Sequence, residues 1–458
     1  MQPSSQVRFT PTTAQWPRTT RQEGQAMAFF LVMLSALATT LLVTWRVGEL
    51  VNRKMRLVNA VDAAAYSGAL LEARALNFDA YMQRAMIANE CAIAQAVSAR
   101  SWMAMVVKTG DNANHVVRFL GPIGRVSESA MRLIKGLATT TTGTLLGSEA
   151  AIGALNATLE GTVNLVKAAT LESLRETAAR TLRANDAGIS STVAAEGIAA
   201  LNAVSWLNAT VRYGRPGRQR ERLKQVVLNS IDGFTRRRDA AVGLLGGGLL
   251  EAGGTDLLGY DAWRGLDTLS VHIPILFWDV EVPLGWGGGQ AGKAAAQRGF
   301  HGGAYRSNPR SARLAEQTLR GTVFRPFRAT NPAFRGLPGT LDIAHPTSRD
   351  DVRVLHIVEA ARSAENSQLV SHYPATPAAM RLDGVGAGAH AGLPNGMLYA
   401  LGAAEVYWAR PVPRSDGRRE YPSVLAPYWQ ARLTRVPVSA YTISIAENGF
   451  ARQQDAAQ

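Results

Sequence analysis

Cysteine is almost absent from this sequence, since Cys91 is the only one among 458 residues. A single cysteine excludes an intramolecular disulfide, a four-cysteine zinc site and a cysteine-ligated iron–sulfur cluster. Charged residues are also scarce, at 18% against ~25% in typical soluble domains. The apolar share of 47% is ordinary for a folded chain. A disordered acidic chain and a charged coiled coil are therefore excluded, and ~100–200 residues per domain predicts two to four structural units.

Catalytic motifs are missing as well. The sequence contains no H-E-x-x-H and no G-x-S-x-G. His356 and Glu359 would share one helical turn if that segment were helical, which is a weak metal signal. The run Gly287–Ala294 departs from the phosphate-binding loop at its last position, where Ala294 lacks the hydroxyl that Mg²⁺ requires, so a mobile glycine loop is favoured. Cys91 is interpreted as a small buried apolar residue. We therefore predict no enzyme, with no catalytic, cofactor-binding or metal-binding residue.

One long apolar run stands near the N-terminus. Residues 25–45 hold 21 positions without a charge, of which sixteen are apolar. As a helix this run spans ~31 Å, which matches a hydrocarbon core of ~30 Å. Trp45 and Arg46 follow where an interfacial aromatic and a headgroup-level cation belong. The run predicts a transmembrane helix behind a basic tail at residues 1–24.

Three interpretations of this run remain open. The preferred one is an uncleaved anchor with a cytoplasmic tail. The second is a secretory signal cut after Ser35–Ala38, although the apolar stretch continues past that point. The third is leader processing between Gly24 and Gln25, as in pilin-like proteins, although such leaders usually place Glu where Phe29 stands. Charge does not decide the orientation, because basic residues flank the run on both sides.

A long helix is predicted to continue from the anchor to about residue 110, because residues 25–121 contain no proline. A stripe at alternating spacings of three and four residues lies along it. Its members are Leu57, Val61, Ala64, Gly68, Leu71, Ala75, Phe78 and Met82. Apolar residues also occur off the stripe, so we expect burial on several sides, inside a bundle or against partner subunits.

For residues 111–268 we predict helices broken by loops, together with a basic segment and a glycine-rich joint. Frequent Thr and Gly weaken any single helix there. Residues 212–238 carry nine Arg or Lys against Glu221 and Asp232. A solvated face is favoured over contact with anionic lipid or an acidic partner, and nucleic acid is the least favoured partner. The glycines between 246 and 254 are interpreted as a flexible joint.

Proline marks the second half of the chain, since fifteen of the twenty prolines lie at or after Pro274. Short β-branched runs at 269–282, 352–357, 397–408 and 437–445 predict strands separated by long loops. The predicted architecture is therefore α+β. It consists of a tail at 1–24, a transmembrane helix at 25–45, a continuing helix at 46–110, a helical region at 111–268 and a β-rich domain at 269–458.

Two stretches resemble one known family. Residues 22–30, running into the anchor and on to residues 59–67, resemble the N-terminus of the TadE/TadG-like proteins of Tad (tight adherence, Flp) pilus assembly. Residues 404–411 and 427–433 are similar to a C-terminal signature in a proteobacterial branch of this group. The signature positions are Glu405, Tyr407, Trp408, Arg410, Pro411, Tyr428, Trp429 and Arg432.

The resemblance implies a single-pass inner-membrane protein with a cytoplasmic N-terminus and a periplasmic bulk. Its implied partners are other pilus-assembly subunits and membrane lipid, with a second copy of the chain as a further candidate. The implied function is non-catalytic pilus assembly, with a minor pilin or surface adhesin as the alternative. The chain lacks the D-x-S-x-S metal motif of the larger family members.

Overall fold

A helix of 93 residues, α1 (Gln25–Val117), is the spine of the protein. At ~1.5 Å per residue it is ~140 Å long. The computed structural model describes residues 25–118, 122–212, 217–244, 247–275, 277–292, 303–320, 330–331, 333–339, 341–343, 352–363, 397–418 and 420–455. The predicted continuation of the anchor helix is confirmed, and the helix extends seven residues beyond the expected end.

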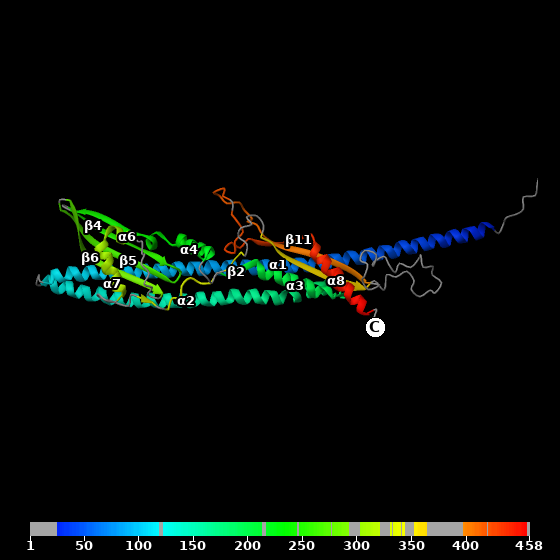
Figure 1. Cartoon of the computed structure of the whole chain (residues 1–458), viewed down its shortest axis with the longest axis horizontal. Helices are drawn as coiled ribbons and strands as arrows, with labels where there is room; N and C mark the ends of the chain where they lie inside the picture. Colours follow the sequence, from blue (N-terminus) through cyan, green and yellow to red (C-terminus); the bar gives the residue numbers. More distant parts are fainter. Residues whose placement is uncertain are drawn as a thin grey trace, which may run out of the picture.

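A second long helix, α2 (Pro122–Asn185), returns along α1 to form an antiparallel hairpin (Figure 1). Helices broken by loops were expected from residue 111 onward; that prediction is wrong over residues 122–185, which form one unbroken helix, whereas separate shorter helices follow after residue 193. The buried positions of α2 repeat at seven-residue steps through Thr142, Glu149, Asn156, Val163 and Thr170. This period keeps one seam against α1, as in a two-stranded coiled coil. Tertiary packing therefore outweighs the weak helix propensity of the Thr and Gly residues.

The first sheet contains β1 (Ile189–Ser190), β9 (Val354–Ser363), β10 (Met397–Trp408) and β11 (Trp429–Thr434), antiparallel and in that order. One face packs on the middle of α1. Helices α3 (Ala194–Ala209) and α8 (Val438–Asp455) cover the other face, where Ile198 and Ala440 meet Ile357. The sheet thus lies between the spine and two shorter helices.

The second sheet lies toward the C-terminal end of α1 (Figure 1). Its order is β3 (Arg238–Leu244), β4 (Gly247–Leu258), β5 (Ala262–Ile275), β6 (Trp278–Gly292) and β7 (Thr330–Asn331). Helices α6 (Gly303–Ser307) and α7 (Pro309–Arg320) pack on the face opposite α1. The connecting elements are β2 (Thr210–Arg212), α4 (Arg218–Ser230), α5 (Gly233–Arg236) and β8 (Leu341–Ile343), and β2 pairs with β8.

Glycines bring the second sheet against the backbone of α1. A Cβ atom on Gly287 would overlap the Ser101 carbonyl and the Met105 amide nitrogen. Gly285 and Gly289, on the same face of β6, also approach α1 backbone closely. The run that was expected to be a mobile loop is therefore a strand from residue 287 to 292, and its glycines serve close packing.

The α+β class is confirmed, but the strands begin earlier than expected. Strands β3 and β4 lie inside the region predicted to be helical, and the proposed boundary at residue 269 falls within β5. Of the glycines expected to form a joint, Gly247, Gly248, Gly253 and Gly254 are part of β4, which pairs with β5 residue by residue, and Gly246 lies outside the described residues. Proline frequency therefore does not mark a fold boundary, because both sheets are built along the same helix.

Candidate functional site

The first turns of α1 expose an apolar surface along the whole predicted anchor. Most large side chains from Met27 to Trp45 are exposed, and no residue in the most apolar stretch of this helix is buried within the chain. By length and composition the segment can cross a membrane. It is therefore a candidate anchor. Gly24 lies outside the described residues, and Gln25 is the first residue of α1.

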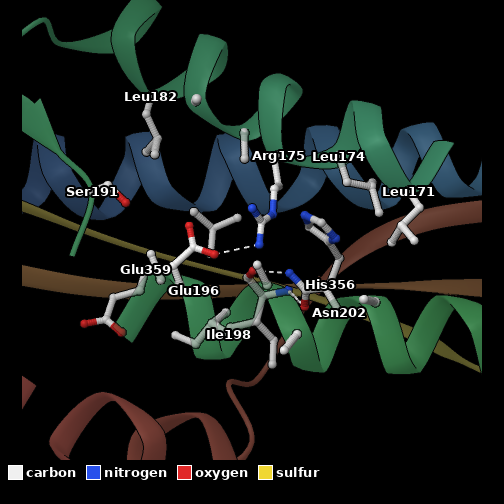
Figure 2. Close-up of a pocket in the computed structure, with 18 of the residues that line it drawn as sticks. Leu171, Leu174, Arg175, Leu182, Ser191, Glu196, Ile198, Asn202, His356 and Glu359 are labelled. Carbon is white, nitrogen blue, oxygen red and sulfur yellow. Dashed lines mark hydrogen bonds and ion pairs between the residues drawn. The ribbon is translucent and has the colours of Figure 1, made fainter. Parts of the chain in front are cut away.

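A pocket of about 580 Å³ opens between α2, α3 and the edge of β9 (Figure 2). Its walls are mostly apolar, with Leu174 and Leu182 from α2 and Ile198 from α3. An ion pair of 2.6 Å joins Arg175 of α2 to Glu196 of α3 across it. Both partners are well exposed, so this pair adds little to stability.

Two polar side chains reach this pocket from opposite faces of β9. His356 lies on the α1 side, while Glu359 accepts hydrogen bonds from Ser444 and Asn448 of α8. The sequence suggested a weak metal site at His356 and Glu359 on the condition that this segment is helical, which would place both side chains on one face. In a strand, residues three apart point to opposite faces, so the two side chains do not converge. Among the described residues, no group of three potential ligands is placed to hold a metal ion.

His356 instead meets Glu72 and Gly68 of α1. Its Nδ1 lies 3.4 Å from Glu72 Oε1, and both side chains are buried. Burial raises the pKa of Glu72, and the nearby imidazole opposes this shift. A Cβ atom on Gly68 would overlap the imidazole ring, so glycine makes the space that His356 occupies. The close fit of these three residues holds β9 against this turn of α1.

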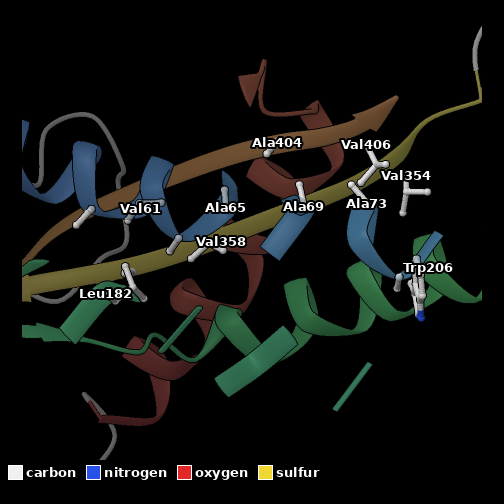
Figure 3. Close-up of a cluster of buried hydrophobic side chains, with 14 of the residues drawn as sticks. Val61, Ala65, Ala69, Ala73, Leu182, Trp206, Val354, Val358, Ala404 and Val406 are labelled. Atoms are coloured by element: carbon white, nitrogen blue, oxygen red, sulfur yellow. The ribbon is translucent and has the colours of Figure 1, made fainter. Parts of the chain in front are cut away.

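The stripe predicted along α1 faces the first sheet (Figure 3). The buried cluster joins Leu57, Val61, Ala64 and Ala75 to residues of β9 and β10 such as Val358. Gly68 is also buried, whereas Leu71, Phe78 and Met82 are half-buried. Residues off the stripe, including Ala65, Ala69, Ala73 and Leu76, are buried in the same cluster. The stripe is thus used within the chain, and the helix is buried on several sides.

The structure brings the C-terminal signature together in the β10–β11 ladder. Glu405 pairs with Arg432 across the strands, and Arg432 Nε donates to Glu405 Oε1 at 2.6 Å. Arg353 of β9's N-terminal flank also binds Glu405. The Arg432 guanidinium lies 4.6 Å from the ring centroid of Tyr407. Two cations and one buried carboxylate thus form a polar cluster with an aromatic side chain.

The remaining signature residues form an aromatic group at the end of the same ladder. Trp408 pairs with Trp429 in register, and Trp408 meets Tyr428 edge-on at 5.7 Å. Arg410 lies 5.5 Å from the Tyr428 ring. Trp429 is buried against α1, and Pro411 is exposed just after β10. The signature therefore encodes a strand pair that docks on the spine.

The basic segment is divided among several elements. Arg238 is buried in a two-bond ion pair with Asp267, and Arg220 donates to the Leu337 carbonyl. Arg222 pairs with Asp342 at 3.5 Å. Arg215 lies outside the described residues. Three cations of the basic segment therefore contact partners within the chain, each in a different place.

One family model matches a continuous segment that includes the exposed start of α1 and the first buried turns after it. Residues 24–74 match the family model of the TadE/G-like Flp pilus-assembly domain. The TadE/G-like segment thus covers the candidate anchor and the stripe from Leu57 to Leu71. Comparison with curated proteins and with solved structures gave no match.

Sequence reasoning missed how the edges of the first sheet are closed. Asn202 of α3 binds both the N–H and the C=O of Ile357 in β9, at 2.9 and 2.7 Å. Asn77 of α1 binds Trp429 of β11 in the same way, at 3.0 and 2.9 Å. Each amide imitates a neighbouring strand. Asparagine disfavours helix, so its presence in the middle of a predicted helix is the only sequence signal that could have indicated these contacts.

Proposed function

We propose that this protein is a non-catalytic, membrane-anchored component of Tad/Flp pilus assembly. The observation that carries the proposal is the TadE/G-like match over residues 24–74, which coincides with an exposed apolar helix and its buried continuation. The anchor holds the chain in the inner membrane with the tail at residues 1–24 in the cytoplasm. The helical hairpin and both sheets then lie in the periplasm.

Recognition of other subunits is assigned to surfaces that remain exposed. The stripe from Leu57 to Met82 faces the chain's own first sheet, so it supports partner binding by holding that sheet in place. Helix α2 carries exposed apolar side chains, among them Leu133, Leu137 and Leu165. These positions are candidate contacts for pilus-assembly subunits or for a second copy of the chain.

A catalytic function would need convergent polar groups in the pocket near His356. The pocket exists, but His356 contacts Glu72, and Glu359 is bound by α8. Since the two do not act on one point of the pocket, this pair of residues gives no support to the catalytic alternative.

The test is the location and N-terminus of the mature chain. Filaments are sheared from cells, and the intact mass and first residue are determined in the sheared and membrane fractions. An assembly component stays in the membrane fraction and begins at Met1 or Gln2. A chain found with the filaments and beginning at Gln25 would be a processed minor pilin, which would contradict the proposal.

A further inference from the structure

The tips of two adjacent hairpins in the second sheet are free of charge. Residues 240–244, which end β3, and residues 247–250, which begin β4, are all Ala, Val, Leu or Gly. Residues 268–275 of β5, together with Phe277 and Trp278, include His272 as their only titratable residue. The tips lie side by side, because Gly248 of β4 pairs with His272 of β5. A continuous apolar end of the sheet results.

Large apolar side chains at these tips are exposed. Phe277 is 93% exposed and Trp278 is 77% exposed, although aromatic side chains of this size are normally well covered. Val242, Ile273 and Ile275 are exposed beside them. Exposed apolar residues gathered at one end of a sheet mark an interaction surface.

Cations follow the aromatic tip at a short distance. Arg310 of α7 donates to the Glu281 carbonyl at 3.0 Å, and Glu281 lies three residues, or ~10 Å, along β6 from Trp278. Arg306 and Arg313 are exposed on the same pair of short helices. The nearest carboxylate on the strand, Asp279, is paired with His272 at 2.6 Å. The aromatic pair therefore stands at the end of the β5–β6 hairpin, and Arg310 lies behind it along the sheet.

We propose that these hairpin tips bind the surface of an anionic lipid bilayer. Trp suits the headgroup level, Phe suits the boundary between headgroups and acyl chains, and each Arg near the surface is attracted to anionic lipid. A protein partner is less favoured, because the tips offer almost no polar side chains to fix its orientation. Insertion stops at the interface, since β3 is an edge strand whose unpaired backbone groups cannot enter hydrocarbon.

The spine sets the distance between this surface and the N-terminal anchor. The second sheet meets α1 as far along as Asn112, which donates to the Leu284 carbonyl at 2.8 Å. From Trp45 to Asn112 the helix rises ~100 Å. The hairpin tips therefore reach a second lipid surface about 100 Å from the anchor. This distance rests on the proposed anchor, whereas lipid binding by the tips does not.

The experiment uses the full chain with its anchor in immobilised lipid nanodiscs. Fluorescent vesicles of phosphatidylcholine, with or without phosphatidylglycerol, are then offered, and captured fluorescence is measured. The wild type should capture vesicles that contain phosphatidylglycerol. The double variant Phe277→Ser/Trp278→Ser should bind them roughly tenfold more weakly or worse, because two large apolar groups are lost.

Two control variants make the result specific. Val412→Ser/Tyr421→Ser removes exposed apolar groups elsewhere and should leave capture unchanged. Arg306→Gln/Arg313→Gln should lower capture of anionic vesicles more than capture of neutral ones. Equal capture by the wild type and the tip variant, or no capture by the wild type, would overturn the inference. Nanodisc incorporation is scored separately by size exclusion, so failure of the anchor and failure of the tips are distinguishable.

Discussion

Gly68 of α1 and His356 of β9 lie in direct contact, and the imidazole occupies the space that any larger side chain at position 68 would need. The contact fixes where the first sheet sits on the spine. The contact depends on both residues, because Gly68 leaves space next to the helix and the imidazole of His356 occupies that space beside Glu72.

Replacing Gly68 should therefore detach the sheet from α1. We expect Gly68→Ala to lower the free energy of unfolding by about 1–3 kcal/mol through overpacking, and Gly68→Leu to abolish pilus assembly. Gly143 of α2 faces open space, so Gly143→Ala should be neutral or stabilising. Chemical unfolding in detergent and filament counts measure both effects. Normal assembly in a Gly68→Leu strain would contradict this role.

The second sheet should be equally sensitive at Gly287. A side chain at this position would point at the backbone atoms of Ser101 and Met105, and backbone atoms cannot rotate away as a side chain can. Gly287→Ala should thus destabilise the protein by about 1–3 kcal/mol and expose the second sheet to limited proteolysis. Gly243→Ala, in β3 with nothing close to it, is the matched control. Equal stability of the two variants would show that the sheet does not need this close approach.

Asn202 should contribute more to stability than an ordinary surface asparagine. Its amide satisfies both backbone groups of Ile357, and truncation leaves them unpaired in a buried site. We expect Asn202→Ala to cost about 2–3 kcal/mol of unfolding free energy. Asn164→Ala, which removes an exposed bond within α2, should cost less than about 0.5 kcal/mol. Similar losses for both variants would argue against an edge-closing role.

Stability should fall as pH rises toward neutrality. Burial raises the pKa of Asp79 and of Glu90 to about 7, above the ~4 expected in the unfolded chain. The folded state therefore binds more protons between pH ~4 and ~7, so the free energy of unfolding decreases across that range and levels off above it. Asp79→Asn should make the slope shallower by up to about 1.4 kcal/mol per pH unit. An unchanged slope in unfolding curves collected from pH 4 to 8 would refute this assignment.

The sequence by itself determined the linear features of the protein. The charge-free run at residues 25–45 and the absence of proline up to Gly121 were enough to predict an anchor that continues as one long helix. The spacing of Leu57, Val61 and Ala64 also identified a buried stripe. These features depend on local periodicity and covalent geometry, which can be read from residues that are consecutive in the sequence.

Only the tertiary structure decided what packs against that helix. The period of α2 was hidden because its buried seam includes Thr142, Glu149 and Asn156, which are not apolar, and the seam is stabilised by bonds to α1 such as the 2.8 Å contact of Arg100 with Glu149. The glycines around Gly287 looked mobile because nothing local shows that a helix backbone will lie on them. Burial of polar groups and close approach of backbones depend on residues that are distant in sequence. Long-range contacts therefore determine the seam of α2 and the strand at Gly287.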